Sequence, residues 1–268
     1  MNHLMRELAP ITEEGWDAIE ETARATVGRF LAARRLVDFE GPHGWQYSAS
    51  SAGRVEKKAA TQPVPGAHLR VRRVVSAVEL RVPFRVARSE IDAVDRGASD
   101  PDLDELEEAA RRLAHAENQT VLEGVKAANI TGIIAASSHP PIALDAGFET
   151  YPRSVAWAVE RLREIGVNGP YALALGPAEY TGVVETTEQG GPIAKHLERL
   201  LDGGPIVWGP GLTGGLVVSL RGGDFVLESG EDISIGYSHH DEEYVHLFFE
   251  ESFTFRVNEP RAAIILKR

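Results

Sequence analysis

RVEKKAATQPVPGAHLRVRRVVSAVELRVPFRVAR, residues 54–88, is the stretch that decides the fold of this chain. It carries nine Lys or Arg residues against only Glu56 and Glu79, which gives it a net charge of +7. Because the whole chain has a net charge of −12, the other residues carry a net charge of −19. Its second half alternates apolar and basic residues around a proline, which is typical of an edge strand or a bent strand pair. Because so basic a segment is hard to bury within its own acidic subunit, we expect it to be an arm that contacts another copy of the chain. The residues predicted to make this contact are Arg54, Arg70, Arg72 and Arg73.

The composition restricts the classes of protein to which the chain can belong. Its 268 residues are 43% hydrophobic and 25% charged, as in an ordinary globular protein, and its pI near 5.3 argues against general nucleic-acid binding. The absence of cysteine excludes disulfides, thiolate catalysis and Cys-ligated metals, and it favours a reducing cytosol. The sequence has no apolar leader and no run of about 18 apolar residues, so we expect neither export nor membrane spanning.

Helical and strand-like patterns flank the arm. Thr12 is the predicted N-cap of a helix with one apolar face, which ends near Arg35. The following segment reads as short strands and turns, with a projecting two-stranded arm at residues 45–80. Ser99-Asp100-Pro101 predicts the start of a second helix, with Pro at its first position and acidic residues in its first turn. This helix should run to about Gly124 and form the spine of the fold.

The C-terminal half alternates helices and strands and then becomes sheet. Within residues 133–225 the predicted helices are 152–166 and 192–201, and the predicted strands are 171–176 and 216–220. The tail predicts an antiparallel sheet of short strands separated by Gly or acidic turns, at 225–227, 233–235, 244–249, 253–257 and 263–266. The chain is therefore predicted to have an α+β fold.

Three motifs invite a chemical interpretation. Residues 209–214 match G-x-G-x-x-G, but a strand-like run follows where a dinucleotide site needs a helix, so we predict a turn between strands. The run His239–Glu243, with His246 behind it, contains many metal-ligand types, but we interpret it as an acidic connection between two strands and predict no metal site. His139 lies in a Pro-stiffened loop and no G-x-S-x-G elbow is present, so no catalytic residue is predicted.

Phrases distributed in order along the chain resemble one protein family. They are Leu8-Ala9-Pro10, Arg34 to Trp45 (RRLVDFEGPHGW), Glu90-Ile91-Asp92, Asn168-Gly169-Pro170-Tyr171, Arg221 to Phe225 (RGGDF), Asp232 to Tyr237 (DISIGY) and Glu251 to Phe255 (ESFTF). In this order they resemble the family 1 encapsulin shell proteins, and the match covers essentially the whole chain.

The resemblance implies the Hong Kong 97-type capsid fold of tailed phages, which is an α+β fold. Residues 1–40, 81–132 and 226–268 would form the peripheral domain, with the N-terminal helix, the long spine helix and an antiparallel sheet. Residues 41–80 would form the extended loop, a β-arm that lies on a neighbouring subunit. Residues 133–225 would form the axial domain, which gathers around symmetry axes.

The resemblance also implies a structural role without catalysis. Roughly 60 copies are expected to close into a T=1 icosahedral nanocompartment in the bacterial cytoplasm, around cargo enzymes that dock through a C-terminal targeting peptide. The expected cargo is a ferritin-like iron-oxidising protein or a dye-decolorising peroxidase, with roles in iron storage or oxidative stress. The alternatives are a phage major capsid protein, which shares the fold, and a hydrolase that would use His139, His239 and His240. Neither nucleic acid nor a membrane is an expected partner.

The same resemblance implies a cargo-docking site and a pore loop, and it leads us to expect no bound flavin. The candidate residues for docking the cargo peptide in a mostly apolar groove are Phe30, Leu31, Arg34, Asp38 and Ile235. The loop lining the fivefold pore would consist of Glu185, Thr186, Thr187, Glu188, Gln189, Gly190 and Gly191, whose small and acidic side chains suit water, small substrates or cations. Some relatives hold a flavin against an aromatic residue just before the Glu-Ile-Asp phrase. Ser89 occupies that place here, so we expect no flavin and no other cofactor.

Overall fold

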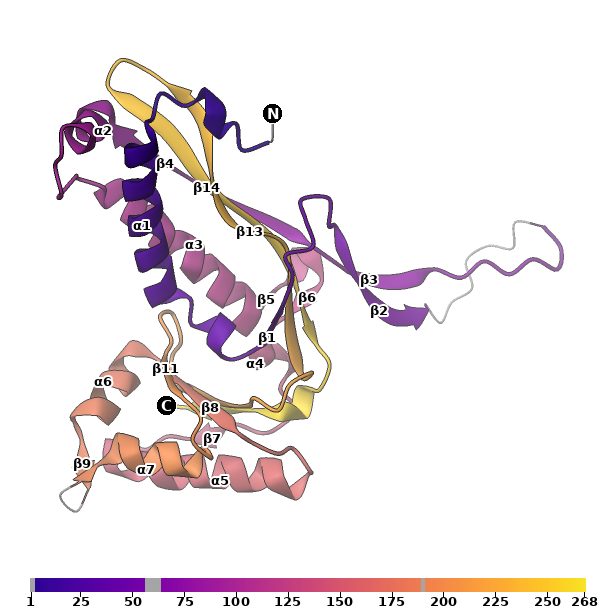
Figure 1. Ribbon diagram of the computed structural model, residues 1–268. Helices are drawn as coiled ribbons and strands as arrows, with labels where there is room; N and C mark the ends of the chain where they lie inside the picture. The colour runs from indigo at the N-terminus through magenta and orange to yellow at the C-terminus, as the bar shows by residue number, and fades with distance from the viewer. Residues whose placement is uncertain (1–2, 56–63, 189–190) are drawn as a thin grey trace.

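Two sheets and a projecting arm organise the computed structural model, which describes residues 3–55, 64–188 and 191–268 (Figure 1). The first sheet has four strands in the order β1 (Asp38–Glu40), β13 (Phe225–His240), β14 (Tyr244–Val257) and β4 (Val78–Ala87). β1 runs parallel to β13, whereas the two other pairs are antiparallel. This mixture of long antiparallel strands and packed helices confirms the predicted α+β class.

The tail differs from its prediction as a series of short strands. β13 and β14 are continuous over 16 and 14 residues, so the Gly and acidic residues taken as turns lie inside strands. The pairing of β13 with β14 shifts register on both sides of Glu231, so β13 continues through residues whose side chains do not alternate regularly. Glu250 and Glu251 stay buried within β14, where Glu250 pairs with Arg81 and Glu251 accepts a hydrogen bond from Arg34. The acidic connection predicted at residues 239–243 is confirmed as the turn between these two strands.

Two long helices pack against the first sheet. They are α1 (Glu13–Phe30) and α3 (Asp104–Leu122), and a short helix α2 (Arg88–Asp95), which the sequence analysis missed, follows β4. Thr12 is the N-cap of α1, as predicted, because its Oγ1 accepts a hydrogen bond from the backbone N–H of Gly15 at 3.1 Å. α1 ends five residues before Arg35, and a 3-10 helix at Ala33–Arg35 follows it.

The predicted start of the spine helix at Pro101 is wrong. Glu90 accepts the backbone N–H of Asp102 at 3.0 Å, and the Asp102 carboxylate accepts the backbone N–H of Asp104 at 3.1 Å. These bonds hold residues 101–103 in an irregular conformation, and the helix begins at Asp104. Its apolar side, including Leu106 and Leu113, is fully buried against α1 and the sheet, which confirms the predicted spine.

The second sheet forms the other end of the molecule. Its five strands, in order, are β11 (Ile206–Trp208), β8 (Tyr171–Leu175), β12 (Gly215–Ser219), β15 (Ala263–Lys267) and β7 (Ile142–Ala143). The helices of this half are α4 (Ile133–Ala136), α5 (Tyr151–Glu164), α6 (Pro177–Glu185) and α7 (Ile193–Leu200). β8, β12, α5 and α7 confirm the predicted strands and helices, whereas α6 was not predicted. All residues of β8 and β12 are buried, which explains their unbroken apolar runs.

The C-terminal strand joins the second sheet, not the first. β15 pairs antiparallel with β12 and parallel with β7, so the C-terminal strand belongs to the second sheet. β15 thus shares a sheet with β8 and β12 of the predicted axial domain, and the bounds of the peripheral and axial domains stay a prediction. The sequence shows only that 263–266 form a strand, because its pairing partners are set by the 3-10 helix at Pro260–Ala262 that redirects the chain.

The arm is a two-stranded ribbon that projects away from both sheets (Figure 1). It consists of β2 (Ala49–Val55) paired antiparallel with β3 (Arg72–Ser76), and residues 56–63 between them lie outside the described part of the chain. Four arginines, which we call the arm arginines, are exposed: Arg54, Arg70, Arg72 and Arg73. Val64 and Val74 are also more than half exposed. A long ribbon with exposed apolar side chains has no core of its own, so it is suited to a surface on another molecule.

Candidate functional site

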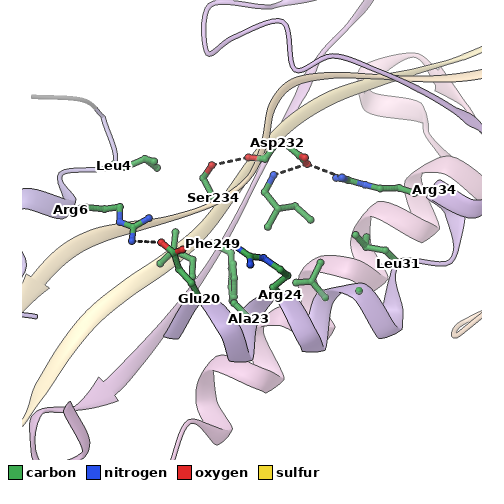
Figure 2. A pocket seen from close by; sticks show the side chains of 14 residues that line it. Leu4, Arg6, Glu20, Ala23, Arg24, Leu31, Arg34, Asp232, Ser234 and Phe249 are labelled. Carbon is green, nitrogen blue, oxygen red and sulfur yellow. Dashed lines mark hydrogen bonds and ion pairs between the residues drawn. The ribbon is translucent and has the colours of Figure 1, made fainter. Parts of the chain in front are cut away.

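A groove lies between α1 and β13, with the N-terminal segment along one side (Figure 2). Its volume is about 520 Å³. The apolar residues that line it are Leu4, Ala23, Val27, Gly28, Leu31, Ile233, Ile235 and Phe249. The polar residues that line it are Arg6, Glu20, Arg24, Arg34, Asp232 and Ser234. The groove therefore has an apolar interior with charged groups around it.

The helical wall follows from the spacing of residues along α1. Ala23, Val27 and Leu31 recur every fourth position and so lie on one side of the helix. Gly28 is beside Val27, and a Cβ built there would meet no heavy atom within 4 Å. The missing side chain leaves open space in the groove wall at this position.

Arg34 sits among three acidic side chains at one end of the groove. Its guanidinium donates to Glu117 Oε2 at 2.6 and 2.8 Å and to Asp232 Oδ1 at 2.7 Å, and it also donates to Glu251 Oε2 at 3.2 Å. Burial disfavours the charged guanidinium, but the hydrogen bonds and charges of Glu117 and Asp232 raise the pKa of Arg34 above its ordinary value. Figure 2 shows the bond to Asp232 at the groove edge.

Glu251 differs from an ordinary carboxylate in this cluster. Its side chain is 1% exposed, and burial followed by the charge of Glu117 raises its pKa well above the ordinary value, although Arg34 opposes this. The protonated form of Glu251 is therefore favoured. The cluster combines the Arg34 guanidinium with the side chains of Glu117 and Asp232 and with the Glu251 carboxyl group, which resists ionisation.

The other end of the groove is held by the N-terminal segment. Arg6 pairs with Glu20 of α1, and its guanidinium lies 4.1 Å from the ring centroid of Trp16. The backbone N–H of Tyr237 donates to the carbonyl of Leu4 at 2.8 Å, which attaches the segment to β13. Within the described chain Arg24 has no ion-pair partner, so this groove cation is available to a ligand.

The structure brings together three of the five residues predicted to dock the cargo peptide. Leu31, Arg34 and Ile235 line the groove. Phe30 instead packs edge-on against Trp208 of β11, with ring centroids 5.5 Å apart. Asp38 accepts a hydrogen bond from the backbone N–H of Gly223 at 2.5 Å and lines a separate hollow of about 210 Å³.

Other groove residues were missed by the sequence analysis. The i, i+4 spacing of Ala23, Val27 and Leu31 could have indicated the helical wall of the groove, but the same spacing is equally typical of a helix face packed in the core. Leu4 and Phe249 reach the groove from distant parts of the chain, and no local pattern links them. The opposing wall is therefore a product of tertiary structure.

The predicted pore loop lies at the far end of the second sheet (Figure 1). Glu185 ends α6, and the segment continues as a narrow antiparallel hairpin of β9 (Thr187–Glu188) and β10 (Gly191–Pro192). Glu185 and Thr187 are exposed, Thr186 is half-buried, and Gln189 and Gly190 lie outside the described residues. The loop's role at a fivefold axis stays a prediction.

The motifs with catalytic residue types form ordinary structural contacts. Residues 209–214 connect β11 to β12, which confirms the predicted turn. The rings of His239 and His246 stack with centroids 4.2 Å apart, and His246 Nε2 lies 3.0 Å from Asp241 Oδ2. The hydrogen bond from His246, followed by two backbone N–H groups, lowers the pKa of Asp241. His139 Nε2 lies 2.9 Å from the backbone carbonyl of Arg261. In the described part of the chain no helix is long and apolar enough to cross a membrane.

Comparison with known proteins settles the family. The family described as "Encapsulating protein for peroxidase" matches residues 1–254. A type 1 encapsulin shell protein from Rhodospirillum rubrum is 46% identical over 272 residues, covering 100% of this chain and 97% of the relative. The chain belongs to the type 1 encapsulin shell proteins. It is thus a structural protein that forms a nanocompartment, and not an enzyme, so the hydrolase alternative is wrong.

Solved structures confirm the capsid fold of this encapsulin. A virus-like particle from Pyrococcus furiosus superimposes with a TM-score of 0.67 at 14% identity, covering 94% of this chain and 99% of that chain. A structure of Mycobacterium phage Adephagia gives 0.54 at 12% identity, with 89% of each chain covered. At such identities the likeness shows the Hong Kong 97-type fold alone. The high identity to encapsulins therefore separates this chain from the phage capsid alternative.

Proposed function

We propose that this encapsulin binds the C-terminal targeting peptide of a cargo enzyme in the groove between α1 and β13. The observation that supports docking most strongly is the groove itself, whose volume of about 520 Å³ is within the usual range for ligand sites. An extended peptide places alternate side chains on one side, and these would bury in the apolar interior. Of the five docking residues predicted from sequence, the proposal retains Leu31, Arg34 and Ile235.

Charged groups at the groove would fix the direction of the peptide. Arg24 lies on the groove side of α1 and has no ion-pair partner among the residues described, so it would pair with a carboxylate of the peptide. Arg34 and Asp232 would offer a donor and an acceptor at the opposite end. Arg34 keeps its internal ion pairs in this arrangement and serves mainly to shape the site.

A dye-decolorising peroxidase is the favoured cargo, ahead of a ferritin-like protein. The support is that the matching family is described as encapsulating a peroxidase. A compartment of this kind in the bacterial cytoplasm would serve defence against oxidants. Small substrates would enter through a fivefold pore lined by residues 185–191.

Filling the groove tests the docking proposal. Gly28→Leu would place a side chain in the open space at position 28, and Ala25→Leu on the exposed side of the same helix is the matched control. The probe is a fluorescent protein that carries the C-terminal tail of a peroxidase encoded beside this gene, co-expressed with the shell. We expect at least tenfold less fluorescence per shell for Gly28→Leu and no change for Ala25→Leu. Equal loading of both variants would reject the groove as the docking site.

We further propose that roughly 60 copies assemble into a closed T=1 icosahedral shell, each arm lying across a neighbour. The exposed apolar and basic side chains of the arm support this arrangement. Negative-stain images of the purified chain test it directly, and closed particles of one diameter are expected. A monodisperse monomer at high protein concentration would contradict it.

A further inference from the structure

We propose that His3, Glu231 and Glu250 form a binding site for a divalent transition-metal cation. The site lies where the N-terminal segment crosses the first sheet, and it is separate from the proposed peptide contacts. Among the described residues these three are the group of His and acidic side chains whose ligand atoms all lie within 4.8 Å of one another. The His239–Glu243 run that drew attention in the sequence does not form such a group.

The distances between the three ligand atoms suit a single cation. His3 Nε2 lies 2.7 Å from Glu231 Oε2 and 3.3 Å from Glu250 Oε1. Nitrogen and oxygen ligands bind Zn²⁺ at about 2.1 Å, so neighbouring ligands are about 3.4 Å apart in tetrahedral and about 3.0 Å apart in octahedral geometry. The His3–Glu250 separation matches these values, and Glu231 would move away from His3 by a few tenths of an ångström to bind the same cation. One imidazole and two carboxylates match the preferences of such cations, and water would complete the coordination.

Two of the three ligand atoms lack hydrogen bonds. His3 Nε2 and Glu231 Oε2 are both inaccessible to solvent, and neither has a hydrogen-bond partner of normal geometry. Their 2.7 Å separation therefore brings two polar atoms together without the alignment of a hydrogen bond. Buried polar atoms are normally satisfied, and a cation between them would satisfy both at once.

The surrounding structure holds each ligand in place. The ring of His3 stacks on Trp45 with centroids 4.5 Å apart and planes inclined by 8°. The irregular pairing of β13 at Glu231 turns that side chain out of the regular alternation. Arg81 Nε donates to Glu250 Oε2 at 2.7 Å, which orients the carboxylate and leaves Oε1 toward His3.

The local charge also favours a cation. Glu250 is 2% exposed and Glu231 is 14% exposed, and Arg81 neutralises only one of these two carboxylates. A divalent ion would compensate the remaining negative charge in a place that water hardly reaches. The alternative without metal is a simple ion pair between a protonated His3 and the carboxylates.

Metal binding to the intact protein distinguishes the two arrangements. The full-length shell is stripped with a chelator and dialysed against Co²⁺, and bound cobalt is measured by mass spectrometry and visible absorption. We expect about one Co²⁺ per chain in the wild type, and an affinity at least tenfold weaker in His3→Gln and in Glu231→Gln. His239→Gln removes an exposed histidine near the end of β13 and is the matched control, which should bind like the wild type.

His3→Gln changes a residue near the chain end, and particle size by light scattering verifies that its shell is intact. Cobalt bound equally by the wild type and by His3→Gln would overturn the proposal. No retained cobalt in the wild type would also overturn it and would leave the ion pair as the explanation. Equal loss of affinity in His239→Gln would show nonspecific binding and count against the site.

Discussion

Arginines have opposite environments in the first sheet and in the arm. Arg81 and Arg256 of the sheet, and Arg34 of the 3-10 helix beside it, are each paired with buried or nearly buried glutamates of the same chain. The arm arginines are exposed, and none of them has an ion-pair partner in the part of the chain that the structure describes. The same residue type thus completes the interior of one region and remains unpaired in the other.

This contrast shows that the charged groups of the first sheet are paired within one subunit, whereas those of the arm are not. A buried ion pair is tolerated only where good geometry and further hydrogen bonds offset the loss of hydration, as around Arg34. An exposed cluster of like charges gains nothing from its own chain and repels itself. Such a cluster becomes favourable when an acidic surface of another copy covers it.

Reversing the charge of the arm should have the largest effect. Arg70→Glu, Arg72→Glu and Arg73→Glu together should abolish assembly while leaving the subunit folded, because these side chains have no partners to lose within the chain. Light scattering and negative-stain images measure the particles, and circular dichroism measures the fold. The matched control reverses three exposed arginines of the body, Arg29, Arg35 and Arg96, and should still assemble. Particles of unchanged size and yield from the arm variant would show that the arm arginines are not needed for contacts between subunits.

Removing Arg34 tests the paired region. Arg34→Ala leaves Glu117, Asp232 and Glu251 without their shared cation, and breaking a buried pair in this way costs about 3–5 kcal/mol. We expect a clear fall in the thermal unfolding midpoint at fixed protein concentration. Arg34→Lys retains the charge but loses the multiple hydrogen bonds, so its unfolding midpoint should lie between those of the wild type and Arg34→Ala. A midpoint equal to that of the wild type would show that the cluster adds no stability.

The smallest effect is expected from the pH dependence of Glu251. Its pKa is raised in the folded state, so the folded protein holds this proton more tightly than the unfolded chain does. The resulting stability is fully present below the ordinary pKa of glutamate and is lost as pH rises through the raised pKa. We expect the unfolding midpoint to decrease on the alkaline side, and to decrease less in Glu251→Gln, which cannot ionise. Parallel pH profiles for the two proteins would exclude this role.

Local patterns predicted much of the fold. Thr12 caps its helix as expected, and α5 and α7 lie where apolar periodicity placed them. The arm predicted at residues 45–80 contains the β2–β3 ribbon, whereas the alternating residues 80–86 lie in β4 of the first sheet. These features depend on neighbours within a few turns of helix or one hairpin, so the sequence contains the information in contiguous form.

Long-range pairing explains the failures. Glu250 and Glu251 read as a turn because an unpaired carboxylate is not expected inside a strand, yet Arg81 and Arg34 reach them from distant segments. The start of α3 was misplaced because Glu90 lies on another helix. The proposed metal site could not be predicted from the sequence, because His3 lies more than 200 residues from Glu231 and Glu250 along the chain.

By itself the sequence determined most of the helices and strands, the charge contrast between arm and body, and the family. Tertiary structure alone decided the composition of the groove, the placement of β15 in the second sheet and the partners of the buried carboxylates. The physical reason is that periodicity, capping and composition act over short stretches. Burial and charge pairing, in contrast, depend on which remote segments the folded chain brings together.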